Sequence, residues 1–138
     1  MRGVMRREAL LWIRAAEEDL VDAEIMFKAG RWFRVAFHAH QAVEKALKAL
    51  FFIVLREEPP RTHIITELYR LLKEGSFTLP NELESQLYIL NKYYTVTRYP
   101  DAAGGLPSES VDEIEARRAL DLARMVVNHV KQYIEGRA

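Results

Sequence analysis

VAFHAHQAVEKALKAL, residues 35–50, carries the clearest helical pattern in the chain. Its apolar residues recur at intervals of three and four, which is the spacing of one helical side. Four alanines stand beside them, and alanine both favours a helix and lets neighbouring helices approach closely. We therefore expect this segment to be the core helix around which the rest of the chain packs.

The other side of the expected core helix is polar and mostly basic. It carries Arg34, His38, Gln41, Lys45 and Lys48, again three or four residues apart. Residues at this spacing share a helical face and can touch one another. Two interpretations are open: an ordinary solvated face, or a basic stripe that offers positive charge and hydrogen bonds to an anion or a partner.

Helical periodicity extends over the whole chain, and no stretch alternates with the period of a strand. Residues 1–7 are expected to form a frayed leader, and helices are expected at residues 8–29, 31–56 and 64–73. A fourth helix should begin at residues 79–81 and end near residue 98. The last helix should begin at a Ser110–Glu113 capping box and end at residue 135. The length of 138 residues predicts one domain, residues 1–138. The predicted fold is all-α, an up-and-down helical bundle of four long-to-medium helices plus one short helix.

Composition excludes several kinds of site. There is no cysteine and the four histidines do not have the spacing of metal ligands, so no metal, cofactor or thiolate chemistry is predicted. A formal net charge of zero argues against a wholesale electrostatic grip on nucleic acid. The longest apolar run, residues 49–55, is too short to span a bilayer, so we expect a cytoplasmic protein without membrane contact. Scarce Asn and Gln with plentiful Glu and Arg fit a thermophile.

The segment RYPD, residues 98–101, stands in the one long loop that is rich in turn-forming residues. Its proline moves Tyr99 out of the helical conformation, so Arg98 is expected in the last turn of a helix. There Arg98 either caps the free carbonyls or binds a phosphate through two parallel hydrogen bonds. Asp101 either caps the turn or joins the same site. If this loop meets the basic stripe, Lys45 and Arg98 would offer two positive charges to one phosphate.

Three segments together resemble the HEPN domain family, whose name stands for higher eukaryotes and prokaryotes nucleotide-binding. They are FHAHQAVEKALKAL at residues 37–50, Thr62–His63 ahead of a helix with two adjacent leucines, and the RYPD loop. The resemblance extends from residue 15 to about residue 134. It implies a helical bundle that forms a homodimer, binds a nucleotide or RNA, and pairs with a small nucleotidyltransferase, frequently as toxin and antitoxin.

Some HEPN proteins are metal-independent RNases, and for these the resemblance implies an arginine followed, after four to six residues, by a histidine. Arg98 matches the arginine position best, but Ala-Gly-Gly at residues 103–105 stands where the histidine belongs. Arg124 and His129 have the required spacing, yet five positions along a helix rotate a side chain by about 140°, so the two should face different ways. The chain is therefore expected to have no catalysis of its own.

The sequence thus favours a HEPN-like module that binds a nucleotide or a nucleotidyltransferase partner. One alternative is a metal-independent RNase in which His63, His38 or His129 replaces the missing histidine, because a titrating histidine is the natural general acid or base. Another alternative is a purely structural dimerising scaffold. The predicted ligand- or partner-binding residues are Gln41, Lys45, Lys48, His63, Arg98, Tyr99 and Asp101.

Overall fold

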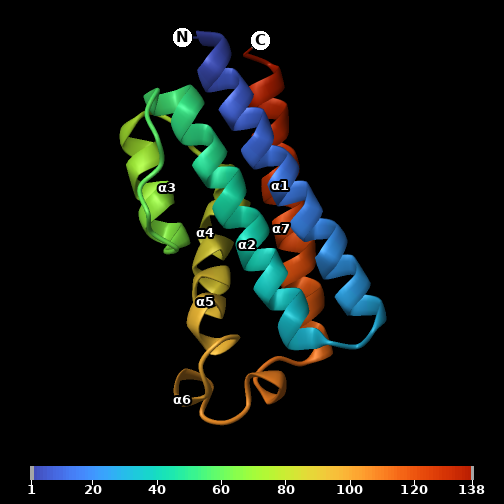
Figure 1. Ribbon diagram of the computed structural model, residues 1–138. Helices are drawn as coiled ribbons and strands as arrows, with labels where there is room; N and C mark the ends of the chain where they lie inside the picture. Colours follow the sequence, from blue (N-terminus) through green and yellow to red (C-terminus); the bar gives the residue numbers. More distant parts are fainter. Residues whose placement is uncertain (1, 138) are drawn as a thin grey trace.

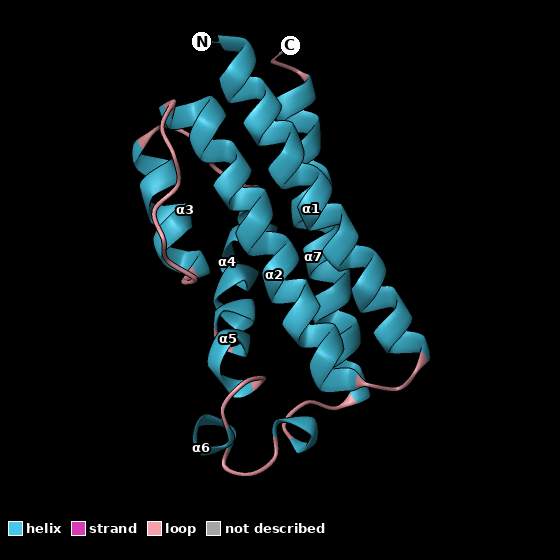
Figure 2. Cartoon of the chain, in the orientation of Figure 1, coloured by secondary structure: helices cyan, strands magenta, loops and turns pink. Residues whose placement is uncertain are grey.

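All regular structure in the described part of the chain is helical. The computed structural model describes residues 2–137, and the side chains of residues 3–137 (Figure 1, Figure 2). The helices are α1 (Arg2–Lys28), α2 (Trp32–Leu50), its π-helical continuation η1 (Phe51–Leu55), α3 (Ile65–Glu74), α4 (Asn81–Asn91), α5 (Tyr93–Val96), α6 (Pro100–Ala103), the 3-10 turn η2 (Pro107–Glu109) and α7 (Glu113–Glu135). The all-α prediction is confirmed. Within the described residues, no helix has the length and apolar character needed to cross a membrane.

Helix α2 is the central element of the bundle. It packs on α1 and α7 along one side, and α3, α4 and α5 lie on its remaining side (Figure 1). Long helices alternate in direction, as the up-and-down prediction requires. The close packing follows from five fully buried alanines on α2: Ala36, Ala39, Ala42, Ala46 and Ala49. Their short side chains let the neighbouring backbones approach, which brings the polar side of α2 close to other helices as well.

The predicted frayed leader is wrong for residues 2–7, which form the first turns of α1. Met5 packs against the core there, and Nη1 of Arg6 donates to the carbonyl oxygen of Ile134 at 3.4 Å. Ile134 lies 128 positions further along the chain, near the end of α7. No local pattern could reveal this neighbour, so the leader looked unsupported in the sequence. Met1 lies outside the described residues.

The fourth predicted helix is divided into α4 and α5 at Lys92. The backbone there keeps nearly helical angles, with φ of −66° and ψ of −24°, so the helix axis is disturbed without a turn. Tyr93 points into the core and is 2% exposed, whereas the ring of Tyr94 lies against His40 of α2 and against His63 in the connection before α3. The division thereby sets the position of Tyr94 beside α2.

The connection into α7 corrects two expectations. The predicted loop at residues 98–107 contains one helical turn, α6, which ends at Gly104 with a φ of 73°. The predicted capping box is also wrong: Asp112 is the N-cap of α7, and its Oδ1 accepts from the backbone N–H of Glu115 at 2.8 Å. Ser110 Oγ instead donates to the carbonyl of Pro107 at 2.6 Å and helps to close η2. The sequence offers two overlapping N-cap residues, Ser110 and Asp112. Because Ser110 belongs to the η2 turn, Asp112 is the one that caps α7.

Candidate functional site

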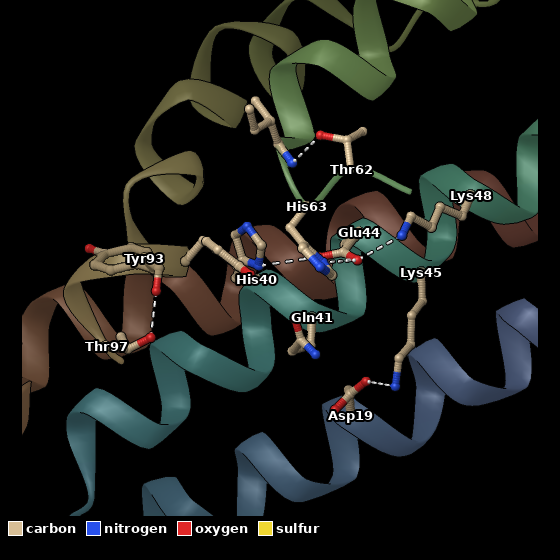
Figure 3. A network of polar contacts seen from close by, with 12 residues as sticks. Asp19, His40, Gln41, Glu44, Lys45, Lys48, Thr62, His63, Tyr93 and Thr97 are labelled. Atoms are coloured by element: carbon tan, nitrogen blue, oxygen red, sulfur yellow. Dashed lines mark hydrogen bonds and ion pairs between the residues drawn. The ribbon is translucent and has the colours of Figure 1, made fainter. Parts of the chain in front are cut away.

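The polar side of α2 is partly covered by other helices. Where it faces α1, His38 and Lys45 of α2 form an ion-pair network with Asp19 of α1. Oδ1 of Asp19 lies 3.1 Å from Nδ1 of His38, and Oδ2 lies 2.7 Å from Nζ of Lys45. Burial would raise the pKa of the Asp19 carboxyl, but the hydrogen bonds from His38 and Lys45 outweigh it and hold the pKa below its ordinary value. Figure 3 shows Lys45 directed toward Asp19. Lys45 therefore ties α2 to α1.

Asp19, Asp22 and His38 have potential ligand atoms within 4.8 Å of one another. Two carboxylates and an imidazole are ligand types that transition metals accept. The ammonium of Lys45 already neutralises Asp19, however, and Asp22 is exposed. The arrangement fits an ion-pair network between α1 and α2 better than a metal centre.

A second network is centred on Glu44, which is 5% exposed. Its Oε2 accepts from Nζ of Lys48 and from Nδ1 of His63, both at 3.0 Å (Figure 3). Because a carboxylate only accepts, Nδ1 of His63 is the donor, and Nε2 remains for another partner. The side chain of His63 is 51% exposed, so the ring is open to a ligand. Glu44 therefore fixes the orientation and the tautomer of an accessible histidine.

His40 lies on the inner side of the same network. Its Nδ1 is 3.9 Å from Oε1 of Glu44, which is too long for a hydrogen bond, and its side chain is fully buried. Burial disfavours the charged imidazolium and lowers the pKa of His40 from 6.5 to about 4. His40 is therefore neutral at neutral pH and brings no charge to the network.

Arg98 connects the end of α5 with α2. Its Cζ lies 4.2 Å from the ring centroid of Tyr94 and 4.3 Å from that of Phe37. Nη1 donates to the carbonyl of Tyr94 at 2.8 Å, and Nη2 donates to Oε1 of Gln41 at 3.2 Å. Arg98 thus caps the end of its own helix and also meets the polar side of α2. Arg98 reaches α2 through Gln41, and Lys45 is paired with Asp19 instead. Lys45 and Arg98 therefore do not form the two-cation phosphate site that the sequence suggested.

The ring of Tyr94 joins Arg98 to His63. The rings of His63 and Tyr94 are stacked, with centroids 4.8 Å apart and an interplanar angle of 11°. We call the connected cluster of Gln41, Glu44, His63, Tyr94 and Arg98 the Arg98 site. Sequence reasoning found three of its members and missed Glu44 and Tyr94. The four-residue separation of Tyr94 from Arg98 was the signal that could have found the second.

Of the remaining predicted residues, Lys48 contacts the Arg98 site through its ion pair with Glu44, whereas Lys45 pairs with Asp19. Tyr99 is 47% exposed and Asp101 is exposed in the first turn of α6. Within the described residues, the side chains of these two make no hydrogen bond or ion pair. They lie beside Arg98 in the chain and form a free rim next to it.

Arg124 and His129, which have a formal RNase spacing, contact different parts of the protein. Nη2 of Arg124 lies 2.9 Å from Oε1 of Glu24 on α1. The ring of His129 lies 6.3 Å from that of Phe77, in the segment between α3 and α4. The expected difference in direction along a single helix is confirmed, and the pair does not form one site.

Three chemical capacities meet in the Arg98 site. The guanidinium is a permanent cation held in place on two aromatic rings. His63 is a potential proton carrier that a buried carboxylate aligns. The Tyr94 ring contacts both of them. Such a combination suits a phosphate group, which needs charge, hydrogen-bond donors and, in transfer reactions, a proton.

Comparison with known proteins gives consistent matches over nearly the whole chain. Residues 9–133 match the family model described as the HEPN domain. The chain is 28% identical to a Methanocaldococcus jannaschii protein described as "Putative toxin MJ1304", over 96% of this chain and 92% of that protein.

Two solved structures are similar in both fold and sequence. TT1696 from Thermus thermophilus superposes with a TM-score of 0.81 and 33% identity, over 91% of this chain and 97% of that one. ST0689, described as an archaeal HEPN homologue, gives a TM-score of 0.76 and 30% identity, over 92% of this chain and 98% of that one.

Proposed function

The chain belongs to the HEPN domain family, and on that basis we propose that it is a nucleotide- and partner-binding module of a toxin–antitoxin pair. Its ligand is a nucleotide, held through a phosphate at the Arg98 site, and its partner is a small nucleotidyltransferase. The module acts in the cytoplasm without catalysis of its own. The observation that carries the proposal is that the fixed guanidinium of Arg98 and the accessible ring of His63 both lie against the ring of Tyr94.

Phosphate binding is supported by the donors that the site leaves available. A guanidinium has five N–H groups, and the contacts of Arg98 to Tyr94 and Gln41 account for two of them. Because these contacts and the two rings fix the group, little conformational entropy is lost when an anion binds. A charge-assisted hydrogen bond contributes about 1.5 to 3 kcal/mol. Lys45 and Lys48 support the site indirectly, because they hold the carboxylates of Asp19 and Glu44 in place.

The partner proposal is supported by similarity to a protein described as a putative toxin. It accords with the pairing of toxin and antitoxin that the family resemblance implies. Tyr99 and Asp101 provide a surface for that chain next to the ligand. The exposed ring of Tyr99 offers a flat apolar face, and Asp101 adds a carboxylate at the rim. A nucleotide at Arg98 and a partner at this rim would lie in contact with each other.

Calorimetric titration with AMP and ATP tests the ligand. Arg98→Lys keeps the charge and loses the planar two-pronged donor, so we expect about tenfold to a hundredfold weaker binding. The melting temperature should also fall, because the bonds of Arg98 to Tyr94 and Gln41 are lost, and the titration is made below it. Lys45→Ala is the matched control, because it removes a cation of the same stripe that belongs to the Asp19 network. It should lower the melting temperature and leave the affinity intact.

Co-purification with the product of the neighbouring reading frame tests the partner. The proposal is wrong if the unchanged protein binds neither nucleotide and retains no nucleotidyltransferase. It is also wrong as to the site if Arg98→Lys binds both as tightly as the unchanged protein.

One observation favours a second function, a metal-independent RNase. His63 is held by Glu44 in the manner of a carboxylate-oriented general base, and Arg98, which contacts the same Tyr94 ring as His63, would bind the scissile phosphate. Incubation of the protein with labelled RNA in EDTA separates the two functions. Cleavage that is lost in His63→Gln and kept in His129→Gln would replace the binding function with catalysis.

A further inference from the structure

Arg98 is a half-buried cation without a counter-ion in the protein. Within the part of the chain that the structure describes, no carboxylate forms an ion pair with its guanidinium. Its partners are the backbone carbonyl and ring of Tyr94, the side-chain oxygen of Gln41 and the ring of Phe37, and none of these carries a charge. A charge taken out of water is ordinarily paired, because an opposite charge offsets the lost hydration. The positive charge of Arg98 is therefore held rigidly and left uncompensated.

Two lysines on the polar side of α2 differ from Arg98 in this respect. Nζ of Lys45 lies 2.7 Å from Oδ2 of Asp19, and Nζ of Lys48 lies 3.0 Å from Oε2 of Glu44 (Figure 3). Both carboxylates are buried, and both are paired with these lysines. The side chains around α2 thus neutralise the lysines and leave the guanidinium charged.

Gln41 occupies the position from which a carboxylate would neutralise Arg98. Its Oε1 accepts from Nη2 of Arg98 at 3.2 Å, and because arginine only donates, the oxygen of the amide must be the atom that faces it. One turn earlier on α2, the ring centroid of Phe37 lies 4.3 Å from Cζ, so the guanidinium lies across a single turn of this helix. A glutamate has the size and shape of glutamine and would accept the same hydrogen bond, but it would form an ion pair with the arginine. The neutral amide therefore restrains the guanidinium without cancelling its charge.

We propose that Gln41 sets the charge selectivity of the Arg98 site, because it positions the guanidinium and leaves the positive charge free for the phosphate of the ligand. This inference rests on the proposed nucleotide-binding function and deepens it. Gln41 is a positioning residue, since it acts through Arg98. The site selects its ligand by the anionic group, so a nucleotide binds and the corresponding uncharged nucleoside binds weakly.

Two substitutions at Gln41 separate charge from geometry. Gln41→Glu keeps the acceptor and cancels the charge, so AMP should bind at least about tenfold more weakly. Its melting temperature should stay equal or rise, because the bond to Arg98 becomes charge-assisted. Gln41→Met keeps the length of the side chain and removes the acceptor, so the affinity should fall less and the melting temperature should drop. A merely structural role would give the reverse order of affinities, because glutamate replaces the acceptor and methionine does not.

Calorimetric titration of the full chain with AMP and with adenosine measures the selectivity. The unchanged protein should bind adenosine at least about tenfold more weakly than AMP, since adenosine lacks the group that meets the guanidinium. Gln132→Glu, on the exposed side of α7, is the matched control. It changes the net charge by the same amount as Gln41→Glu and should leave the affinity for AMP intact.

The outcomes distinguish the role of Gln41 from the proposed function. If the unchanged protein binds neither AMP nor adenosine, the nucleotide-binding function is wrong and the role of Gln41 falls with it. If the unchanged protein binds AMP but Gln41→Glu binds it as tightly, or more tightly than Gln41→Met does, only the role of Gln41 is wrong. The same holds if adenosine binds as tightly as AMP, or if Gln132→Glu weakens AMP binding as much as Gln41→Glu does.

Discussion

The buried neutral His40 predicts a defined loss of stability when the pH falls from 7 to 5. Its side chain is fully buried, and burial lowers its pKa from 6.5 to about 4. The negative charge of Glu44 opposes this shift, and the positive charge of Arg98 adds to it. A histidine in the unfolded chain keeps a pKa near 6.5, so it binds a proton at pH 5 whereas the folded protein does not.

The sign and the size follow from proton linkage. Because the folded pKa is depressed, the stability is fully present above pH 6.5 and is lost as the pH falls toward 4. Two pKa values of 6.5 and about 4 give a loss of about 2 kcal/mol between pH 7 and pH 5. At the entropy of unfolding usual for a chain of this length, this loss lowers the melting temperature by roughly 5 to 8 °C.

Urea denaturation followed by circular dichroism at pH 7 and pH 5 measures this loss. His40→Leu removes the titrating group, so the difference between the two pH values should shrink by about 2 kcal/mol relative to the unchanged protein. Val43→Ala, a fully buried change on the same helix, is the matched control. It destabilises the protein without removing a titrating group and should keep the full difference. An equal pH dependence in His40→Leu and the unchanged protein would refute the reasoning.

Two further predictions concern close contacts around α3, each measured as a melting temperature or a denaturation midpoint. Gly75→Ala would place a Cβ 2.5 Å from Cδ2 of Leu55 and 2.9 Å from Cγ1 of Val54, and these two side chains must shift, so we expect a loss of about 1 to 3 kcal/mol. A variant as stable as the original would mean that the two side chains move without cost. Tyr69→Phe removes the acceptor of the buried N–H of Leu79 at 3.0 Å, and it should cost about 1 to 3 kcal/mol. No change there would show that this N–H finds another partner.

Periodicity was sufficient to predict the long helices, because each buries one face and the spacing of apolar residues shows that face directly. The helical leader was not predictable, since the partner of Arg6 is Ile134 at the other end of the chain. Burial of Glu44 was hidden for the same reason. Its spacing from Lys48 predicts an exposed pair, and only the return of the chain at His63 covers it.

The Arg98 site was predicted in part. The sequence indicated that Arg98 ends a helix, which is a local property, and it offered Gln41 and Lys45 as neighbours on α2. Which of the two meets Arg98 depends on the rotation of α2 about its axis. The pairing of Asp19 with Lys45 accompanies that rotation, and no pattern within one helix shows it.

The buried alanines of α2 limit how this sequence can change over evolutionary time. Any larger side chain at Ala39, Ala42 or Ala46 would push apart helices that now pack closely, and glycine would weaken the helix by about 1 kcal/mol at each position. Few substitutions survive both limits, so this segment should drift slowly whatever task the protein performs. Similarity to another protein within this segment therefore indicates a shared helix packing. Whether the two proteins also share an activity is better judged from side chains such as Glu44 and Arg98.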